Sequence, residues 1–543
     1  MPKRAFGKII IPILAISLAM TACGQTQEAL SGSGFKFEEA DYDAERQNQE
    51  NSDASGSDVS SADNNANADG SGSGNGSAGS MPGNTSGSGS VSTSGQAIDE
   101  TYVNILNGTD KDMLSADYWI NLYYAGGGSS QEIMTPSEIQ EMNVLNESLI
   151  AVDGFEPFTQ MSLVDTMDGK LVRALVDCVE APKDPSTVYL NGQPTTAAYW
   201  KELKKLQNLE AIPDTVTLRY GYSVDRRSLR SYPTNDFVGN SKTDEFFDQL
   251  VMSEYMPYLP LVIIHESADK EWMYVVTYGF VGWVESEYVA LCHDRGEWLS
   301  YMNPEEVLVV TGREIRLPDV QGDERISGLI LPMGTTMPLV KVEDAPKSIH
   351  GRTTHNNYVV RLKVRGKDGY LEETYGLVAV AEDVHVGFLP YTTENVLRQE
   401  FKLLGDRYGW AGLGHSDDCS GTLRMVYCCF GFEIPRTGGG QIAMKGLKHF
   451  DLEDMGDDEK SQVLKGMLPG SFVFFPGHIM MYVGTVNSEA YVISSVSTFA
   501  TLDMADGDIM SSNTVDVNNL LKTKRKSGKS WLASLTQALQ ISK

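Results

Sequence analysis

The chain has 543 residues, which is too long for one compact domain and predicts two to four domains. Its formal net charge of −29 argues against nucleic acid and anionic lipid headgroups as electrostatic partners. An acidic surface of this kind indicates a soluble chain that resists non-specific association.

The N-terminus has the pattern of a bacterial export signal. Lys3, Arg4 and Lys8 form a basic segment, and residues 9–20 are an apolar run too short to span a bilayer. The sequence "MTAC" follows and resembles a lipobox, in which Cys23 is lipidated and becomes the mature N-terminus. We therefore expect residues 1–23 to be a lipoprotein signal and the rest to be extracytoplasmic, lipid-anchored to a bacterial membrane. An ordinary cleaved signal peptide is the alternative.

Residues 24–97 are dominated by Ser, Gly, Asn and Asp and carry too few apolar residues to bury a core. We expect a disordered tether. A coil of roughly 70 residues has a root-mean-square reach of about 50 Å, which would hold a domain off a membrane.

Residues 98–213 show short helical patterns separated by loops. In "TPSEIQEMNVLNESLI", Thr135, Pro136 and Glu138 form a capped helix start with proline in its first turn. We expect a helical N-terminal domain here, without a catalytic constellation.

Two groups of short strands follow, rich in β-branched and aromatic residues and separated by turn residues. They include "LPLVIIHES" and "EWMYVVTY" in the first group and "VLVVTGREIRL" and "NYVVRLKVRG" in the second. We expect two small β-barrels, residues 214–300 and 301–387, and the spacing fits barrels of the SH3-like kind. Trp272 and Trp283 are expected in the core of the first barrel.

Residues 388–543 begin with two helical patterns and continue with the strand-like runs "SFVFF", "HIMMYVG" and "AYVISSVS". Helices followed by antiparallel strands are typical of an α+β domain. The expected fold class is therefore multidomain α+β.

The first cysteine of this domain has an unusual setting. Asp418 is a good helix N-cap, so Cys419 takes the first helical position, where the helix dipole and free N–H groups favour a thiolate. A thiolate nucleophile needs a basic partner, and His478 stands at the start of a strand after a Pro-Gly turn. The six cysteines show no C-x-x-C pair, so neither a disulfide scaffold nor a zinc site is expected.

The segments "YGWAG", "DDCSG", "YCCFGFEIPRTGGGQ" and "LPGSFVFFPGHIMMYVG" together resemble the NlpC family of bacterial cell-wall cysteine peptidases. The resemblance covers about Leu389 to the C-terminus. The upstream regions are similar to an arrangement known in that family, with a helical clip-like domain and two bacterial SH3-like domains. It implies a papain-like fold, no cofactor or metal, and hydrolysis of the γ-D-glutamyl to diamino-acid bond in murein stem peptides.

The resemblance also assigns catalytic residues. Cys419 matches the nucleophile, His478 the general base, and Tyr408 the tyrosine whose hydroxyl helps the oxyanion hole. The third polar residue, which orients the histidine, is expected on the next strand. Ser494 is the best match, and Ser495 is its neighbour on the opposite face.

Asp418, Ser420, Arg436 and Thr437 are expected to shape the substrate subsite. Thr437 and Gly438 stand where relatives that recycle free peptides carry an Asp-Ser or Asn-Ser pair, which helps hold the free amine of the terminal L-alanine. The departure predicts weaker dependence on that amine.

A rival possibility is that a carboxylate of the first barrel, for example Glu254 or Glu285, binds the amine instead. The barrel would then wall off the active site and limit it to small peptides. The other reading of the two barrels is a structural or wall-binding role.

Two further functions remain open from the sequence. One is an N-acetylmuramoyl-L-alanine amidase, since related amidases share the Cys-then-His order. The other is a non-catalytic cell-wall-binding lipoprotein, favoured by the altered "TGGGQ" and by a serine as orienting residue. The "IPR" segment, the paired barrels and intact Tyr408, Cys419 and His478 favour the peptidase. The expected partners are peptidoglycan stem peptides and a membrane, with no nucleic acid, and the protein is expected to be a monomer.

Overall fold

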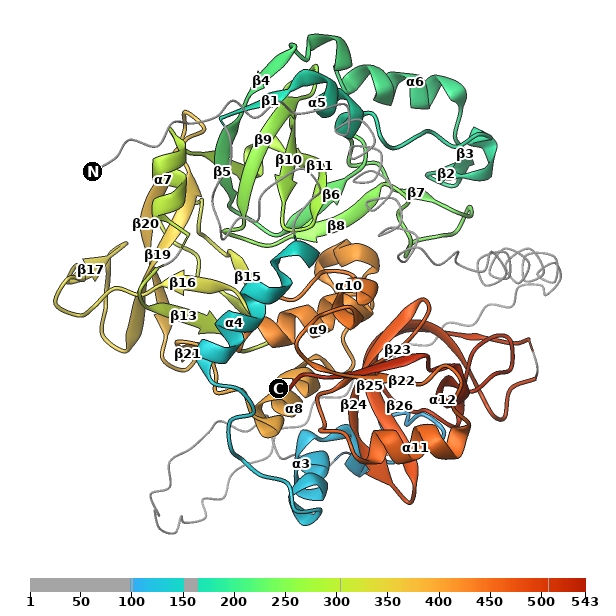
Figure 1. Ribbon diagram of the computed structural model, residues 1–543. Coiled ribbons are helices and arrows are strands. Elements are labelled where there is room, and N and C mark those ends of the chain that lie inside the picture. Colours follow the sequence, from blue (N-terminus) through green and yellow to red (C-terminus); the bar gives the residue numbers. More distant parts are fainter. Residues whose placement is uncertain (1–97, 99–100, 151–164, 303, 506) are drawn as a thin grey trace, which may run out of the picture. The chain divides into compact units, whose positions relative to one another are not determined.

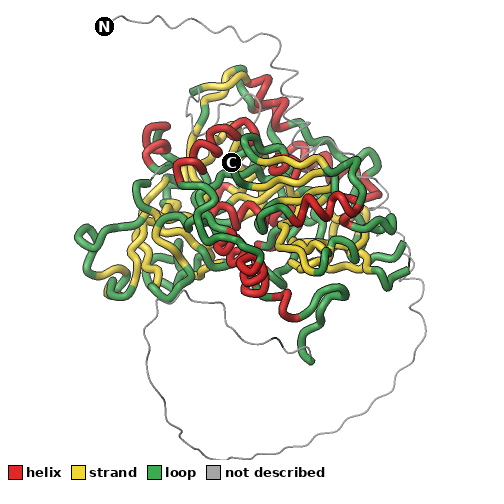
Figure 2. Tube along the Cα trace, turned by 60° about the horizontal axis from the view of Figure 1, so that its bottom comes forward, coloured by secondary structure: helices red, strands yellow, loops and turns green. Residues whose placement is uncertain are grey.

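The computed structural model describes residues 98, 101–150, 165–302, 304–505 and 507–543 (Figure 1). The expected signal peptide, its Cys23 and the tether at 24–97 lie outside the described residues. Within the described part, no helix combines the length and apolarity needed to cross a membrane. Residues 104–543 form one compact unit that contains both helices and strands (Figure 2).

The first two long helices pack into the core of the C-terminal domain. They are α3 (Ala116–Ala125) and α4 (Pro136–Asn146), and α4 begins at the expected capping box of Thr135 and Glu138. Trp119 of α3 is fully buried in the same cluster as Tyr391 and Tyr427 of the C-terminal domain. These two helices therefore bury their apolar residues in the C-terminal domain and are stabilised by it.

The next two helices pack against the first barrel. They are α5 (Gly169–Val176) and α6 (Ala197–Leu206). Val172 and Leu175 of α5 share a buried cluster with Trp283, whereas Trp200 of α6 packs with Tyr232. Short strands connect this region to the barrel: β1 (Thr166–Asp168), β2 (Tyr189–Leu190), β3 (Gln193–Pro194), β4 (Thr215–Thr217) and β7 (Val238–Gly239). Of the four helices, α3 and α4 thus pack against the C-terminal domain, and α5 and α6 pack against the first barrel.

The first barrel is a seven-stranded antiparallel sheet in the order β12-β5-β9-β10-β11-β6-β8. Its β-branched and aromatic residues alternate into a core that holds Trp283 at 0% and Trp272 at 6% exposure, as expected. The helix α7 (Arg295–Ser300) follows. The strands are β5 (Arg219–Ser223), β6 (Arg227–Arg230), β8 (Val251–Tyr255), β9 (Pro260–Glu266), β10 (Trp272–Thr277), β11 (Phe280–Glu285) and β12 (Val289–Leu291).

The second β module has smaller sheets around the buried Leu308, Met337 and Val360. Strands pair as β16-β13-β21, β14-β15, β17-β18 and β19-β20. The strands are β13 (Val307–Val310), β14 (Glu314–Arg316), β15 (Ile330–Pro332), β16 (Thr336–Pro338), β17 (Ser348–Ile349), β18 (Arg352–Thr353), β19 (Asn357–Arg365), β20 (Leu371–Ala379) and β21 (Val384–Val386).

The C-terminal domain places helices against a sheet in the order β22-β28-β23-β24-β25-β26, with β27 beside β25 (Figure 1). Its helices are α8 (Thr393–Glu400), α9 (Cys419–Cys428), α10 (Gly438–Ile442), α11 (Asp457–Lys465) and α12 (Trp531–Ser534). Its strands are β22 (Lys448–Asp451), β23 (Phe472–Phe475), β24 (His478–Val486), β25 (Glu489–Thr501), β26 (Met510–Asn519), β27 (Thr523–Lys524) and β28 (Gln537–Gln540). The helix α9 contacts both β24 and β25, which places its N-terminus beside the sheet.

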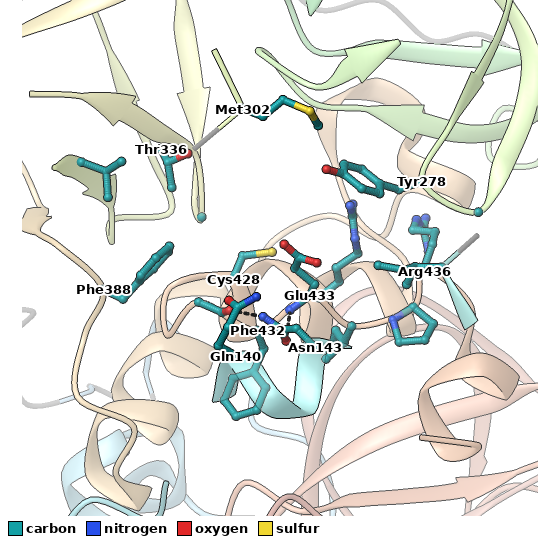
Figure 3. A pocket seen from close by; sticks show the side chains of 18 of the residues that line it. Gln140, Asn143, Tyr278, Met302, Thr336, Phe388, Cys428, Phe432, Glu433 and Arg436 are labelled. Carbon is teal, nitrogen blue, oxygen red and sulfur yellow. Dashed lines mark hydrogen bonds between the residues drawn. The ribbon is translucent and has the colours of Figure 1, made fainter. Parts of the chain in front are cut away.

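A chamber of about 990 Å³ lies where these parts meet. Its walls come from α4, the β10–β11 turn, the segment between the two β modules, the second module, and the C-terminal domain around α9 and α10 (Figure 3). Its volume is at the upper end of the range for small-molecule sites.

A buried ion cluster binds the first barrel to the loop that precedes α9. The Nε of Arg226 donates to Glu254 Oε2 at 2.5 Å, and Nη2 donates to Asp417 Oδ2 at 2.8 Å. The same guanidinium donates to the carbonyl oxygens of His415 at 3.0 Å and Ser416 at 3.2 Å. The side chains of the three charged residues are 7%, 2% and 4% exposed, so the cluster is dry.

Three ionisable groups share this cluster, and their protonation follows from their surroundings. Burial raises the pKa of Glu254 far above its usual range, and the negative charge of the nearby Asp417 raises it further. The positive charge of Arg226 lowers this pKa, but by less than burial raises it. Burial would also raise the pKa of Asp417, but Arg226 and the hydrogen bond from Glu254 bring it below the usual value. The surroundings therefore favour the charged form of Asp417, which pairs with Arg226 at 2.8 Å, and disfavour the charged form of Glu254.

The substitution Arg226→Met should destabilise the protein by about 3–5 kcal/mol, because it leaves the buried Asp417 carboxylate without its cation. The matched control is Arg313→Met. Arg313 also pairs with the C-terminal domain, through Asp406 at 2.7 Å, but its side chain is 54% exposed. Loss of that pair should cost less than about 1 kcal/mol. Urea unfolding of the full chain measures both, and equal losses would contradict the role given to the buried cluster.

Candidate active site

The sulfur of Cys419 lies at the N-terminus of α9. Asp418 is the N-cap, and its Oδ1 accepts from the backbone N–H of Gly421 at 2.9 Å. The backbone N–H groups of Ile479 and Ser420 lie near enough to the Cys419 sulfur to lower the pKa of its thiol. Because Ile479 follows His478 directly, this contact joins the helix terminus to the start of β24.

Burial decides the protonation of this thiol. It raises the pKa of Cys419 to about 12, and the charge of Asp418 adds to the shift. The two N–H donors and Arg436 lower the pKa, but by less. The helix N-terminus alone led us to expect a resting thiolate. In the structure, burial acts against the helix terminus and raises the pKa of this thiol.

His478 is the first residue of β24 and follows Gly477, whose φ of 93° permits the tight turn. Its ring packs beside Phe475 and Trp531, with ring centroids 5.7 and 5.2 Å away. Burial in this apolar setting lowers the pKa of His478 to about 4, with a further contribution from Arg525. The imidazole is therefore neutral near pH 7.

The far side of the imidazole contacts Ser494, with 3.1 Å between His478 Nε2 and Ser494 Oγ. When Nε2 carries the proton, it donates to the hydroxyl oxygen and leaves Nδ1 as an acceptor. Ser495 points to the opposite face of β25, where its hydroxyl donates to the backbone oxygen of Asp417 at 2.7 Å. Of the two serines, Ser494 is thus the one placed to orient His478.

Cys419, His478 and Tyr408 line one cavity of about 110 Å³. The first barrel supplies part of its wall through Met252 of β8 and Phe280 of β11. Phe247 from the same part of the chain packs against Tyr408, with 6.2 Å between ring centroids. The barrel therefore closes one side of the cavity, as one of the two readings of the sequence proposed.

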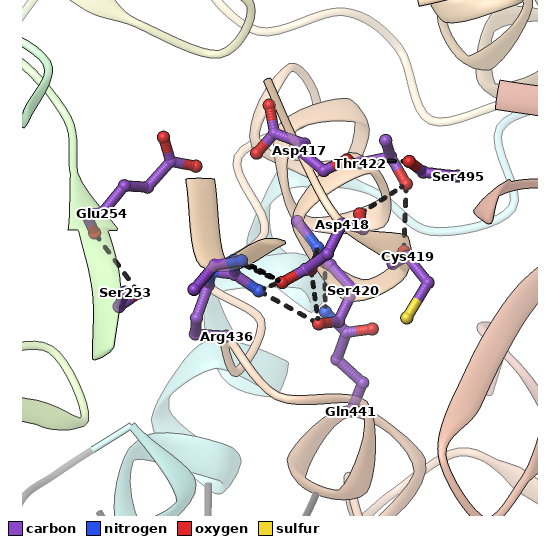
Figure 4. A network of polar contacts seen from close by, with 12 residues as sticks. Ser253, Glu254, Asp417, Asp418, Cys419, Ser420, Thr422, Arg436, Gln441 and Ser495 are labelled. Carbon is purple, nitrogen blue, oxygen red and sulfur yellow. Dashed lines mark hydrogen bonds and ion pairs between the residues drawn. The ribbon is translucent and has the colours of Figure 1, made fainter. Parts of the chain in front are cut away.

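The four residues expected to shape the substrate subsite also line this cavity. Arg436 donates from Nη1 and Nη2 to the two carboxylate oxygens of Asp418, each at 2.8 Å, and from Nη1 to Ser420 Oγ at 3.0 Å (Figure 4). Thr437 is the N-cap of α10, and its hydroxyl accepts from the N–H of Gly440 at 3.1 Å. The charge of Asp418 is thus balanced by a guanidinium, and the Thr437 hydroxyl already has a backbone donor.

The two barrel carboxylates considered as rival amine ligands lie elsewhere. Glu254 faces Arg226 in the buried cluster, and Glu285 accepts from Asn235 Nδ2 at 2.6 Å. Neither is among the described residues that line the catalytic cavity.

Further residues support the site, and of these the sequence singles out Ala411, which stands where relatives commonly have glycine. Gln441 is fully buried, and its Nε2 donates to the carbonyl oxygens of Ser420 at 2.8 Å and Pro435 at 2.9 Å. Ala411 has a φ of 52°, and its N–H donates to Asp418 Oδ2 at 3.1 Å. Gln441 is the last residue of the "TGGGQ" segment, so the sequence could have indicated it. Trp531, which packs beside His478, belongs to no motif that would have indicated its role. In the part of the chain described, no group of three or more His, Cys, Asp or Glu side chains could hold a metal ion.

Comparisons with known proteins agree with this geometry. The model of the NlpC/P60 family matches residues 405–520, and that of an SH3 domain (SH3b1 type) matches residues 238–285. No curated protein matches the chain in sequence.

Among solved structures, the chain is similar to a novel NlpC/P60 endopeptidase from Photobacterium damselae subsp. piscicida. The TM-score is 0.60 at 18% identity, over 76% of this chain and 94% of that chain. An NlpC/P60 family protein from Bacillus cereus ATCC 10987 gives a TM-score of 0.40 at 16% identity, over 59% of this chain and 98% of that chain. The first likeness shows the fold and confirms the expected class, with an SH3-like β domain ahead of a papain-like α+β domain. Residues 405–520 are therefore an NlpC/P60 domain of the cysteine peptidase superfamily, joined in this chain to an SH3b1-type domain.

Proposed function

We propose that the protein hydrolyses murein stem peptides at the γ-D-glutamyl to diamino-acid bond, with Cys419 as nucleophile. The observation that carries the proposal is the arrangement around the small cavity. A cysteine at a helix N-terminus shares it with a histidine whose outer nitrogen contacts Ser494 at 3.1 Å. This is the set of roles that a Cys-His hydrolase requires.

The first half of the reaction breaks the amide bond. As the Cys419 sulfur attacks the carbonyl carbon, His478 Nδ1 takes the thiol proton, and negative charge develops on the carbonyl oxygen. The Tyr408 hydroxyl and first-turn N–H groups of α9, which have no intrahelical partners, stabilise that charge. The intermediate then collapses to a thioester, and the imidazolium gives its proton to the leaving amine of the diamino acid.

The second half regenerates the enzyme. A water molecule attacks the thioester carbonyl while His478 Nδ1 takes one of its protons. The released sulfur takes that proton back, and the product acid gives its remaining proton to solvent and leaves as a carboxylate. Ser494 holds the imidazole in one orientation throughout both halves.

The raised pKa of the thiol and the lowered pKa of the imidazole have a consequence for this mechanism. The resting pair is neutral, so proton transfer accompanies attack on the substrate and does not precede it. A neutral imidazole is a competent base well below pH 6.5, the usual pKa of histidine.

The decisive experiment incubates purified L-Ala-γ-D-Glu-diamino-acid peptides and intact muropeptides with the full chain and identifies each new amine. A new amine on the diamino acid supports the proposal. A new amine on L-alanine indicates the amidase, and no new amine indicates a non-catalytic wall-binding protein. The variant Cys419→Ala should lower kcat by at least about 10⁴-fold, because loss of the nucleophile removes the covalent route.

The buried imidazole also predicts a dependence of stability on pH. Unfolded histidine titrates near pH 6.5, whereas burial lowers the folded pKa of His478 to about 4. Between these values the unfolded chain binds more protons, so stability is full above pH 6.5 and falls as the pH drops towards 4. The loss should be on the order of 3 kcal/mol.

The variant His478→Gln, which cannot titrate, isolates this contribution. Urea unfolding at pH 7 and at pH 4.5 should show a larger loss for the wild type than for the variant. An identical pH dependence of the two proteins would show that His478 is not desolvated as the structure describes.

We also propose, from the lipobox-like "MTAC", that the protein is anchored to a bacterial membrane through Cys23 and faces the cell wall. The variant Cys23→Ser should appear in the soluble fraction, because a lipid chain supplies the membrane affinity. Fractionation after a high-salt wash measures this, and a variant that stays with the membrane would exclude lipidation at that residue.

A further inference from the structure

The chamber of about 990 Å³ adjoins the catalytic cavity. Phe280, Arg436 and Thr437 line both spaces, so they form the boundary between the two. At about 110 Å³, the catalytic cavity is well below the usual size of a ligand site, whereas the chamber is at the upper end. A substrate that extends past the scissile bond therefore has room on the Arg436 side.

That side is the acyl side of the substrate. Thr437 and Gly438 stand where relatives that recycle free peptides hold the amine of the terminal L-alanine, so we assign the acyl part of the substrate to this end of the cavity. Figure 4 shows Cys419 and Arg436 on either side of Asp418, with Arg436 on the side away from the thiol. A group that passes Arg436 is thus attached to the part of the substrate that forms the thioester.

The boundary does not suit a terminal ammonium. Both carboxylate oxygens of Asp418 accept from Arg436, and the Thr437 hydroxyl accepts from a backbone N–H. A buried ammonium without a free anion would cost several kcal/mol of desolvation. An N-acylated peptide carries no charge at this point, so it passes without that cost.

The chamber itself suits a ligand with hydroxyl and amide groups. The Glu433 Oε2 is inaccessible to solvent and has no hydrogen-bond partner among the described residues. Figure 3 shows the Glu433 carboxyl among the side chains that surround the chamber, near Tyr278 and Cys428. Burial raises the pKa of Glu433, which is a sign of poor solvation. A hydroxyl or amide N–H of a ligand would supply that donor once the Glu433 side chain turns its carboxyl into the chamber.

Other walls of the chamber combine planar polar groups with aromatic rings. Asn143 is held by Gly431 O at 2.9 Å and by the N–H of Glu433 at 2.9 Å, so this polar wall is rigid. Arg424 brings a cation, and Phe388 and Phe432 bring apolar faces. A sugar is bound by polar groups that fix its orientation and by aromatic rings that pack against the carbon atoms of its own ring. This chamber contains both kinds of group.

We propose that the chamber binds the N-acyl group of the stem peptide, an acetamido sugar joined to L-alanine through its lactyl group. The inference rests on the proposed function and narrows it, because the preferred substrate is then a stem peptide still attached to glycan.

The test compares three peptides that share the γ-D-glutamyl to diamino-acid bond and carry a free amino terminus, an N-acetyl group or an N-acetylmuramyl group. The muramyl peptide should exceed the free peptide in kcat/KM by at least about tenfold, which corresponds to about 1.4 kcal/mol. The variant Gln140→Trp places a large side chain from α4 in the chamber and should bring that ratio towards one. The control Val144→Trp changes a 54% exposed residue of the same helix and should leave the ratio unchanged.

A second measurement separates this inference from the proposed function. Calorimetry with the Cys419→Ala protein and N-acetylmuramyl-L-alanyl-D-glutamate, which lacks the scissile bond, should show binding that Gln140→Trp weakens at least tenfold. If that binding is seen while no peptide is cleaved, the proposed function is wrong and the chamber assignment holds. A preference for the free amine, or muramyl binding that Gln140→Trp does not change, overturns the assignment.

Discussion

The position of Cys419, the proposed nucleophile, depends on one buried guanidinium. Arg226 comes from the first barrel and binds the backbone of His415 and Ser416 and the carboxylate of Asp417, immediately before the helix that starts at Cys419. A loop with left-handed φ at Ala411 and His415 has little regular structure to hold it. The barrel therefore acts as a structural part of the catalytic domain, and its Met252 and Phe280 complete the wall of the cavity.

The same burial sets the chemistry. A dry cavity raises the pKa of the thiol and lowers that of the imidazole, which removes the ion pair that an exposed Cys-His couple would form. The charges that do remain are internally balanced, Arg226 with Asp417 and Arg436 with Asp418. Burial thus disfavours the charged forms of both Cys419 and His478.

Local patterns in the sequence predicted much of the catalytic geometry. The N-cap at Asp418, the strand that starts at His478 and the two-residue alternation that separates Ser494 from Ser495 are all short-range features, and the structure contains each of them. The pair of Arg226 and Asp417 could not be found this way, because 191 residues separate the partners. The strand β26 could not be predicted, because its sequence "MSSNTVDVNN" is mostly polar, as is possible at the edge of a sheet. The helices at 116–146 could be predicted as helices, but their sequence does not indicate which domain they pack against.

The packing of α3 and α4 into the C-terminal core affects how the protein is made. Trp119 and Ile139 leave the ribosome early, yet their partners Tyr391, Tyr427 and Phe432 are among the last third of the chain to be synthesised. Until those residues arrive, the apolar faces of both helices lack their native cover and invite aggregation. The first barrel, with α5 and α6, can close around its own core in the meantime. The core that holds α3 and α4 is therefore complete only when the two ends of the described chain meet.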